Sequence, residues 1–216
     1  MGALLWKILF YFTIFVFLIF IRVNGYSQLI TLAVVFVAGF LTFLLQFYYP
    51  LVLEKRIDRL ESFLRKQKKK PAIYISFVFA NRLEDEVKLV IEQLMSKYKQ
   101  AKTQAYFKAA FGVYSKDMTT IREAVPYIQK SDYRAYYETI LLIENGESDQ
   151  ARETLESIKK PWMRLALLVE LEMKAGHYEA AIQYAKEAVN SSRGVHRYVL
   201  YKEYERVLPQ AIEGIS

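Results

Sequence analysis

The sequence of 216 residues contains no cysteine, and this absence excludes several kinds of site. Disulfides, thiolate nucleophiles, iron–sulfur clusters and cysteine-based zinc sites all require that residue. Only two histidines are present, His177 and His196, and neither has a metal-ligand partner at a useful spacing, so we interpret both as surface residues. A glycine-rich phosphate loop after a strand and a serine in a nucleophile elbow are also missing. We therefore expect a protein that is not an enzyme and that uses no metal and no cofactor.

Charge is nearly absent from two long apolar runs near the N-terminus. Residues 3–21 contain one charged side chain, Lys7, and residues 29–53 contain none. About 20 apolar residues in a helix cross a hydrocarbon core of roughly 30 Å, and the second run ends in aromatic residues typical of headgroup depth. A cleaved signal peptide is the alternative for the first run, but no small-residue cleavage site follows it. Because neither run holds an ionisable group of the kind found in proton or ion pathways, residues 1–53 predict a transmembrane hairpin that acts as an anchor.

The formal net charge of +7 is concentrated directly after the second run. Residues 54–70 carry a local charge of +5, whereas residues 71–216 are neutral overall, which argues against a nucleic-acid partner. The loop between the runs holds only Arg22, so the positive-inside rule predicts a multi-pass protein of the cytoplasmic membrane with both termini in the cytoplasm. We expect these basic residues to contact anionic headgroups at the membrane surface: Lys55, Arg56, Arg59, Arg65, Lys66, Lys68, Lys69 and Lys70.

Apolar residues recur after the second run at Leu53, Ile57, Leu60 and Leu64. This spacing of four, three and four indicates one apolar seam on a helix that continues out of the span, followed by a linker. The seam either packs on the following domain or the membrane interface, or joins copies of the chain in an oligomer. Two spans, a glycine in the second and the sequence RIDRLE beyond it resemble the lipopolysaccharide-assembly-protein-A type of small bacterial membrane protein.

A period of 30 residues runs through residues 71–216. One column of apolar residues is Phe77, Phe107, Tyr137 and Leu167, and another is Ile91, Ile121, Ala151 and Ala181. Spacings of four within each half predict two amphipathic helices per repeat. We expect helices at residues 72–81, 84–98, 101–114, 117–129, 132–145, 147–158, 161–175 and 178–191, with a closing helix at 195–213. Pro126 should disturb the helix that contains it.

The last repeat carries the most specific motif, Gly176-His177-Tyr178 at a turn, followed by Ala181 and Ala188. A glycine can take the positive φ that ends a helix, and small alanines let two helices approach closely. This stretch resembles the tetratricopeptide repeat, and GESDQA keeps the same spacing one repeat earlier. The period of 30 instead of 34, and the missing alanines of the first two repeats, depart from that family. The resemblance implies an all-α helical-repeat domain.

Helical repeats of this kind imply a concave face that holds a partner protein. In the tetratricopeptide register, the partner-binding residues of that groove would be Tyr133, Tyr136, Ile140, Ile143, Met163, Ala166, Glu170 and Met173. Their mostly aromatic and apolar character favours a hydrophobic or helical partner, although the same residues could pack between repeats. We therefore expect a membrane-anchored adaptor or scaffold. The alternative is a homo-oligomer, a structural or pore-like assembly built from the hairpin and the junction.

Overall fold

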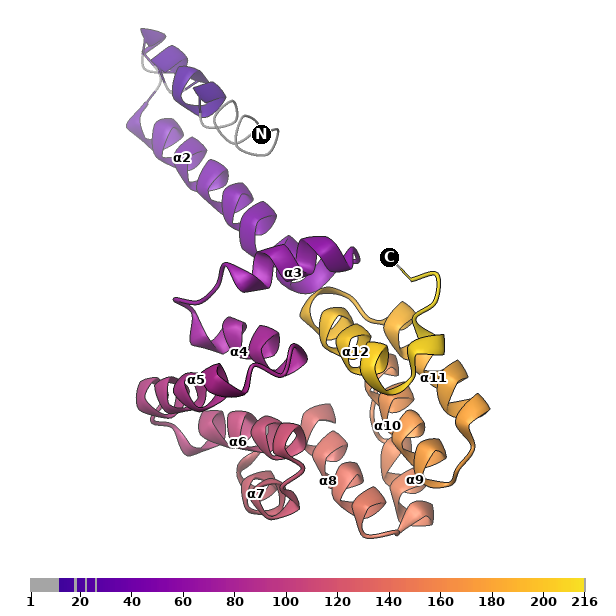
Figure 1. Cartoon of the computed structure of the whole chain (residues 1–216). Helices are drawn as coiled ribbons and strands as arrows, with labels where there is room; N and C mark the ends of the chain where they lie inside the picture. Colours follow the sequence, from indigo (N-terminus) through magenta and orange to yellow (C-terminus); the bar gives the residue numbers. More distant parts are fainter. Residues whose placement is uncertain (1–11, 18, 22, 26, 216) are drawn as a thin grey trace. The chain divides into compact units, whose positions relative to one another are not determined.

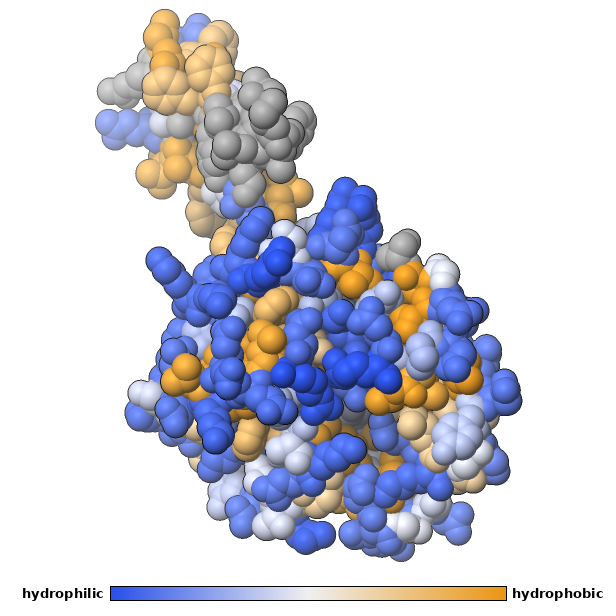
Figure 2. All heavy atoms as spheres, in the orientation of Figure 1, coloured by the Kyte–Doolittle hydropathy of each residue, from blue (hydrophilic) through white to orange (hydrophobic). Residues whose placement is uncertain are grey.

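A computed structural model describes residues 12–17, 19–21, 23–25 and 27–215, and all regular structure within these residues is helical (Figure 1). The all-α prediction is therefore confirmed. The chain forms two compact units, Met1–Pro50 and Leu51–Ser216. Figure 2 shows hydrophilic side chains over most of the visible face of the second unit and mainly hydrophobic ones along the N-terminal segment.

Among the described residues, one helical segment is long and apolar enough to cross a membrane. Helix α2, Gln28–Phe43, continues into the π-helix η1, Leu44–Leu53, and the 26-residue segment has a mean hydropathy of 2.4. Within this segment the Thr42 hydroxyl donates to the Ala38 carbonyl at 2.8 Å, which satisfies that hydroxyl without a partner from another helix. The second expected span is thus present as a candidate membrane helix. The first expected span, residues 3–21, lies largely outside the described residues, which include a shorter apolar helix at Phe12–Ile21.

The second unit consists of helices joined by short turns. They are α3 Ile57–Arg65, α4 Pro71–Ala80, α5 Glu84–Lys97, α6 Ala101–Ser115, α7 Met118–Ala124, η2 Val125–Tyr127, α8 Asp132–Glu144, α9 Ser148–Glu156, α10 Pro161–Lys174, α11 Tyr178–Ser191, α12 Gly194–Val207 and η3 Pro209–Ala211. The expected helices agree closely, and Pro126 does interrupt its helix, which tightens into a 3-10 turn. The closing helix ends earlier than expected, because Leu208 precedes a proline and leaves the helical conformation.

The expected continuous helix from the span into the junction is wrong, because residues 54–56 are not helical. The Glu54 carboxylate accepts the backbone N–H groups of Lys55 at 2.9 Å and Arg56 at 3.1 Å. These N–H groups are therefore not available to the carbonyls of the preceding turn, and a new helix, α3, begins at Ile57. Ile57, Leu60 and Leu64 are buried against α4 and α12, so the seam packs on its own domain. Leu53 remains 37% exposed.

In four helix pairs, the first helix ends in the same type of turn, at a residue with a positive φ. Arg82, Lys116, Gly146 and Gly176 have φ of 52°, 57°, 82° and 78°. The next residue in each turn donates its N–H to the carbonyl five residues earlier, for example His177 to Glu172 at 2.8 Å and Leu83 to Val78 at 3.1 Å. The last three turns are 30 residues apart, as the sequence period predicts. The first two use Arg82 and Lys116 where glycine would be less strained.

The missing alanine of an early repeat has a structural explanation. Ala151 and Ala181 are fully buried where paired helices cross, and Ile121 takes the equivalent place in α7. Opposite Ile121 lies Gly112 of α6, and a Cβ added to Gly112 would meet the Ile121 Cγ1 at 2.6 Å. The small residue is therefore on the other helix of this pair, and the close crossing is kept.

The C-terminal helix α12 packs on α3 and α4 as well as on α11 (Figure 1). The Tyr198 ring stacks on Phe77 with centroids 6.3 Å apart, and its hydroxyl accepts a hydrogen bond from Asn81 at 2.8 Å. Arg206 donates to the Ala80 carbonyl at 2.6 Å. Helices from opposite ends of the unit therefore share one hydrophobic cluster and cover each other's apolar faces.

Candidate membrane-junction site

The backbone just after the candidate membrane helix is held by the start of α12. The Gly194 N–H donates to the Glu54 carbonyl at 2.7 Å, and the Arg197 Nε donates to the Lys55 carbonyl at 2.7 Å. Arg197 also donates to the Val189 carbonyl at 2.6 Å, and burial lowers the pKa of its guanidinium. Gly194 has a φ of +56°, and a Cβ there would lie 2.7 Å from the Val52 Cα. Only glycine allows this approach of the two segments.

All eight residues predicted to face the membrane surface are exposed. Three of them also form ion pairs within the chain: Arg56 with Asp58 at 2.8 Å, Arg59 with Glu54 at 3.5 Å and Lys68 with Glu86 at 3.5 Å. The hydrogen bond to Asp58 raises the pKa of Arg56. The pairs of Arg56 and Lys68 are solvent-exposed and contribute little to stability, so these two side chains can turn toward other anions, whereas Arg59 pairs with the buried Glu54.

A cavity of about 310 Å³ lies beside the held segment. Its apolar lining comes from Leu51, Val52, Ala72, Ile73 and Val195, and its polar lining from Ser76 and His196.

The His196 ring stacks on Trp162 with centroids 4.3 Å apart, and its Nε2 lies 3.4 Å from the Tyr133 hydroxyl. Burial, helped by the positive charge of Lys160, lowers the pKa of His196 to about 4, so the ring is neutral at neutral pH. The surface interpretation of His196 is therefore wrong. His177, in contrast, has a side chain that is 66% exposed and pairs with Glu172 at 2.8 Å.

The expected partner groove is partly filled by the protein itself. Its buried members pack in the core and offer no surface to a partner: Ile140, Ile143, Met163 and Ala166. Tyr136 and Met173 pack against a cluster that includes Leu200 and Tyr204 of α12. Ile143 at 3% exposure and Met163 at 0% lie in the hydrophobic core instead of on an open groove surface.

The part of the groove that stays open lies near the C-terminal ends of α8 and α10. Glu170 is exposed, yet the surrounding protein and the carboxylates of Glu203 and Glu144 raise its pKa. Lys174 pairs with Glu144 at 2.8 Å. Tyr136 and Met173 are half-buried beside this region, whereas Tyr133 is half-buried at the N-terminal end of α8, near Lys160 and His196. A partner could therefore reach an acidic edge with methionine and tyrosine next to it.

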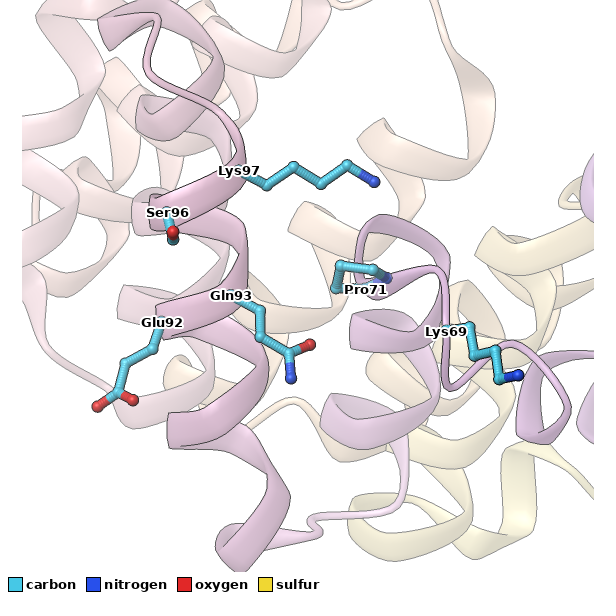
Figure 3. Close-up of a pocket in the computed structure, with 6 residues that line it drawn as sticks. All are labelled: Lys69, Pro71, Glu92, Gln93, Ser96 and Lys97. Atoms are coloured by element: carbon cyan, nitrogen blue, oxygen red, sulfur yellow. The ribbon is translucent and has the colours of Figure 1, made fainter.

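A second hollow, of about 520 Å³, is open and polar (Figure 3). Its lining includes Lys69, Glu92 and Lys97, whose charged groups point in different directions. Side chains that do not converge on one point cannot act together on a substrate. Over the described part of the chain, no group of three or more potential metal ligands occurs.

Sequence reasoning missed Gly194, Arg197 and the inward position of His196. The one local signal was a glycine at the start of the closing helix. No family model, no curated protein and no solved structure matches the chain.

Proposed function

We propose that the protein is a membrane-anchored scaffold that holds a tetratricopeptide-like helical domain at the cytoplasmic membrane surface and binds a partner protein there. The observation that carries this proposal is the short, fixed junction. Only residues 54–56 separate the apolar segment from α3, and α12 holds two of their carbonyls. Three extended residues reach about 10 Å, so the domain stays next to the bilayer.

The distribution of charge supports a cytoplasmic position for the domain. The eight exposed basic residues fall within the first 17 residues after the apolar segment. Each basic side chain near an anionic surface adds roughly 1 kcal/mol of attraction. A two-span hairpin with both termini in the cytoplasm follows from the positive-inside rule. The four matching turns support a helical-repeat arrangement of the domain.

The partner surface of this proposal is the open edge of the predicted groove, at Glu170 and Met173. Methionine adapts to apolar partners, and an acidic edge favours a partner with basic residues. In the alternative homo-oligomer, copies of the chain would have to join through the hairpin alone. The apolar seam is not available for that contact, because Ile57, Leu60 and Leu64 are already buried within one chain.

Site-specific photo-crosslinking in native membranes tests the partner surface. A photoreactive amino acid replaces Glu170 or Met173 in the full chain, and Leu89, which is 59% exposed on α5, provides the control position. We expect one protein to crosslink from both groove positions and not from position 89. A crosslink between two copies of this chain would favour the homo-oligomer instead. Equal crosslinking from all three positions would reject the groove.

A further inference from the structure

We propose that the cavity beside the junction binds an acyl chain of an anionic phospholipid, whose headgroup lies against neighbouring basic residues. The inference rests on the membrane anchoring of the proposed function. Two of the cavity walls, Leu51 and Val52, are among the last residues of the candidate membrane helix. The cavity therefore opens at the depth where acyl chains meet headgroups.

The chemistry of the lining suits an acyl chain. Five of the seven lining residues are apolar, and His196 is neutral where it faces the cavity. The volume of about 310 Å³ is at the lower end of the range for small-ligand sites, which suits part of a flexible chain better than a large rigid ligand. Water in such a cavity would find few hydrogen-bond partners.

Basic residues that lie close in sequence to the cavity lining, together with a hydroxyl in that lining, favour an anionic headgroup. Lys70 is two residues before Ala72, Arg193 is two before Val195, and Lys55 is three after Val52. Within the described residues, the Ser76 hydroxyl has no hydrogen-bond partner, so it can donate to an ester or phosphate oxygen of the lipid. An acyl chain gains little free energy when it moves from the bilayer into an apolar cavity. The preference for one lipid class therefore comes from the contacts between the headgroup and charged residues.

The position of the walls is fixed by the same contacts that hold the junction. The close approach of Gly194 to Val52 sets the distance between the end of the membrane helix and the first turn of α12. The α4 wall, with Ala72, Ile73 and Ser76, is held against α12 by the Tyr198–Asn81 hydrogen bond. The cavity is therefore a preformed part of the domain.

Photolabelling with a defined lipid tests the proposal. The full chain is reconstituted in nanodiscs of phosphatidylcholine that contain a small fraction of phosphatidylglycerol with a diazirine on its acyl chain. After irradiation, mass spectrometry maps the labelled residues. We expect labels on residues 28–53 from the surrounding bilayer and additional labels on residues 72–76 and 195–196. Unlabelled phosphatidylglycerol should suppress the labels on residues 72–76 and 195–196 at a concentration at least about fivefold lower than phosphatidylcholine does. A fivefold difference in affinity corresponds to the attraction of one basic side chain.

Two matched variants separate the cavity from general membrane contact. Ser76→Phe fills the cavity and should reduce labelling of residues 195–196 at least fivefold, whereas Ser96→Phe makes the same change in the hollow of Figure 3 and should leave it unchanged. Labels on residues 28–53 without labels at the cavity would overturn this inference alone. Missing labels on residues 28–53 would overturn the membrane anchoring itself. Equal competition by both lipids would overturn the anionic assignment, and this readout needs no variant to fold.

Discussion

Replacing Gly194 with alanine tests whether the junction is held by α12. Gly194 has a φ of +56°, and a Cβ there would come within 2.7 Å of the Val52 Cα. The backbone would have to move, and the 2.7 Å hydrogen bond from the Gly194 N–H to the Glu54 carbonyl would be lost or lengthened. The substitution therefore combines backbone strain, overpacking and a lost hydrogen bond.

The size of the effect follows from these three contributions. A non-glycine residue in the left-handed region costs roughly 1 to 2 kcal/mol, overpacking adds roughly 1 to 3, and one hydrogen bond contributes roughly 0.5 to 1.5. Partial relaxation reduces the sum, so we expect Gly194→Ala to lower the free energy of unfolding by about 3 to 5 kcal/mol. Gly146→Ala is a matched control, because Gly146 has a φ of +82° and nothing within 4 Å of an added Cβ. Strain alone should cost this control roughly 1 to 2 kcal/mol.

Both variants are measured as full chains in detergent micelles by thermal unfolding with circular dichroism. For a unit of this size, 1 kcal/mol corresponds to a Tm shift of roughly 2 to 4 °C. Limited trypsin digestion reports the junction directly, since Lys55 and Arg56 are exposed cleavage sites whose backbone is fixed in the native protein. Gly194→Ala should accelerate cleavage there and Gly146→Ala should not. Equal Tm shifts and equal cleavage rates for the two variants would refute the close approach of α12 to the junction.

Three further predictions concern the helix crossings, the half-buried His196 and the topology. Ala181→Leu should destabilise the domain by roughly 1 to 3 kcal/mol in denaturant titration, because Ala181 is fully buried at a close crossing; a loss below about 0.5 kcal/mol would contradict that crossing. The pKa of His196 is about 4 in the folded protein and near 6.5 in the unfolded chain. Between these pH values the unfolded chain binds more protons, so the free energy of unfolding falls as the pH drops from about 7 to about 4. His196→Phe keeps an aromatic ring on Trp162 and should lose less stability across that window than the natural protein, whereas parallel pH profiles would exclude His196 as the cause. A reporter that is active only outside the cytoplasm, fused to the C-terminus, should be inactive, and activity would reverse the proposed topology.

The helices of the domain could be predicted from sequence because their signals are local. Apolar spacing of three and four residues marks each buried face, and Gly146 and Gly176 mark two of the turns. Arg82 and Lys116 adopt the same left-handed turn without a glycine, so their turns carried no such signal. In the pair α6 and α7 the small residue, Gly112, lies on the first helix and the large one, Ile121, on the second. This swap can be recognised only when both helices are compared, because each position alone departs from the repeat pattern.

The contacts of α12 could not be predicted because they join distant parts of the chain. Asn81 and Tyr198, which share a hydrogen bond, are 117 residues apart, and Lys55 and Arg197 are 142 apart. Nothing in the local pattern of either segment indicates the other. The packing of the half-buried Tyr136 against Leu200 and Tyr204 of α12 is a contact of the same long-range kind.

The position of α12 explains which surface remains for a partner. In an open array of helix pairs, each end exposes an apolar face that must be covered. Here Tyr198 on α12 and Val78 on α4 are both fully buried in one cluster, so α12 and the first helix pair cover each other's apolar faces. Glu203 of the same helix forms ion pairs with Arg82 and Arg206, which links the turn between α4 and α5 to α12. Because α12 packs on α3, α4 and α11 and also holds the backbone of residues 54–55, the proposed partner surface is the rim of the groove that α12 leaves exposed.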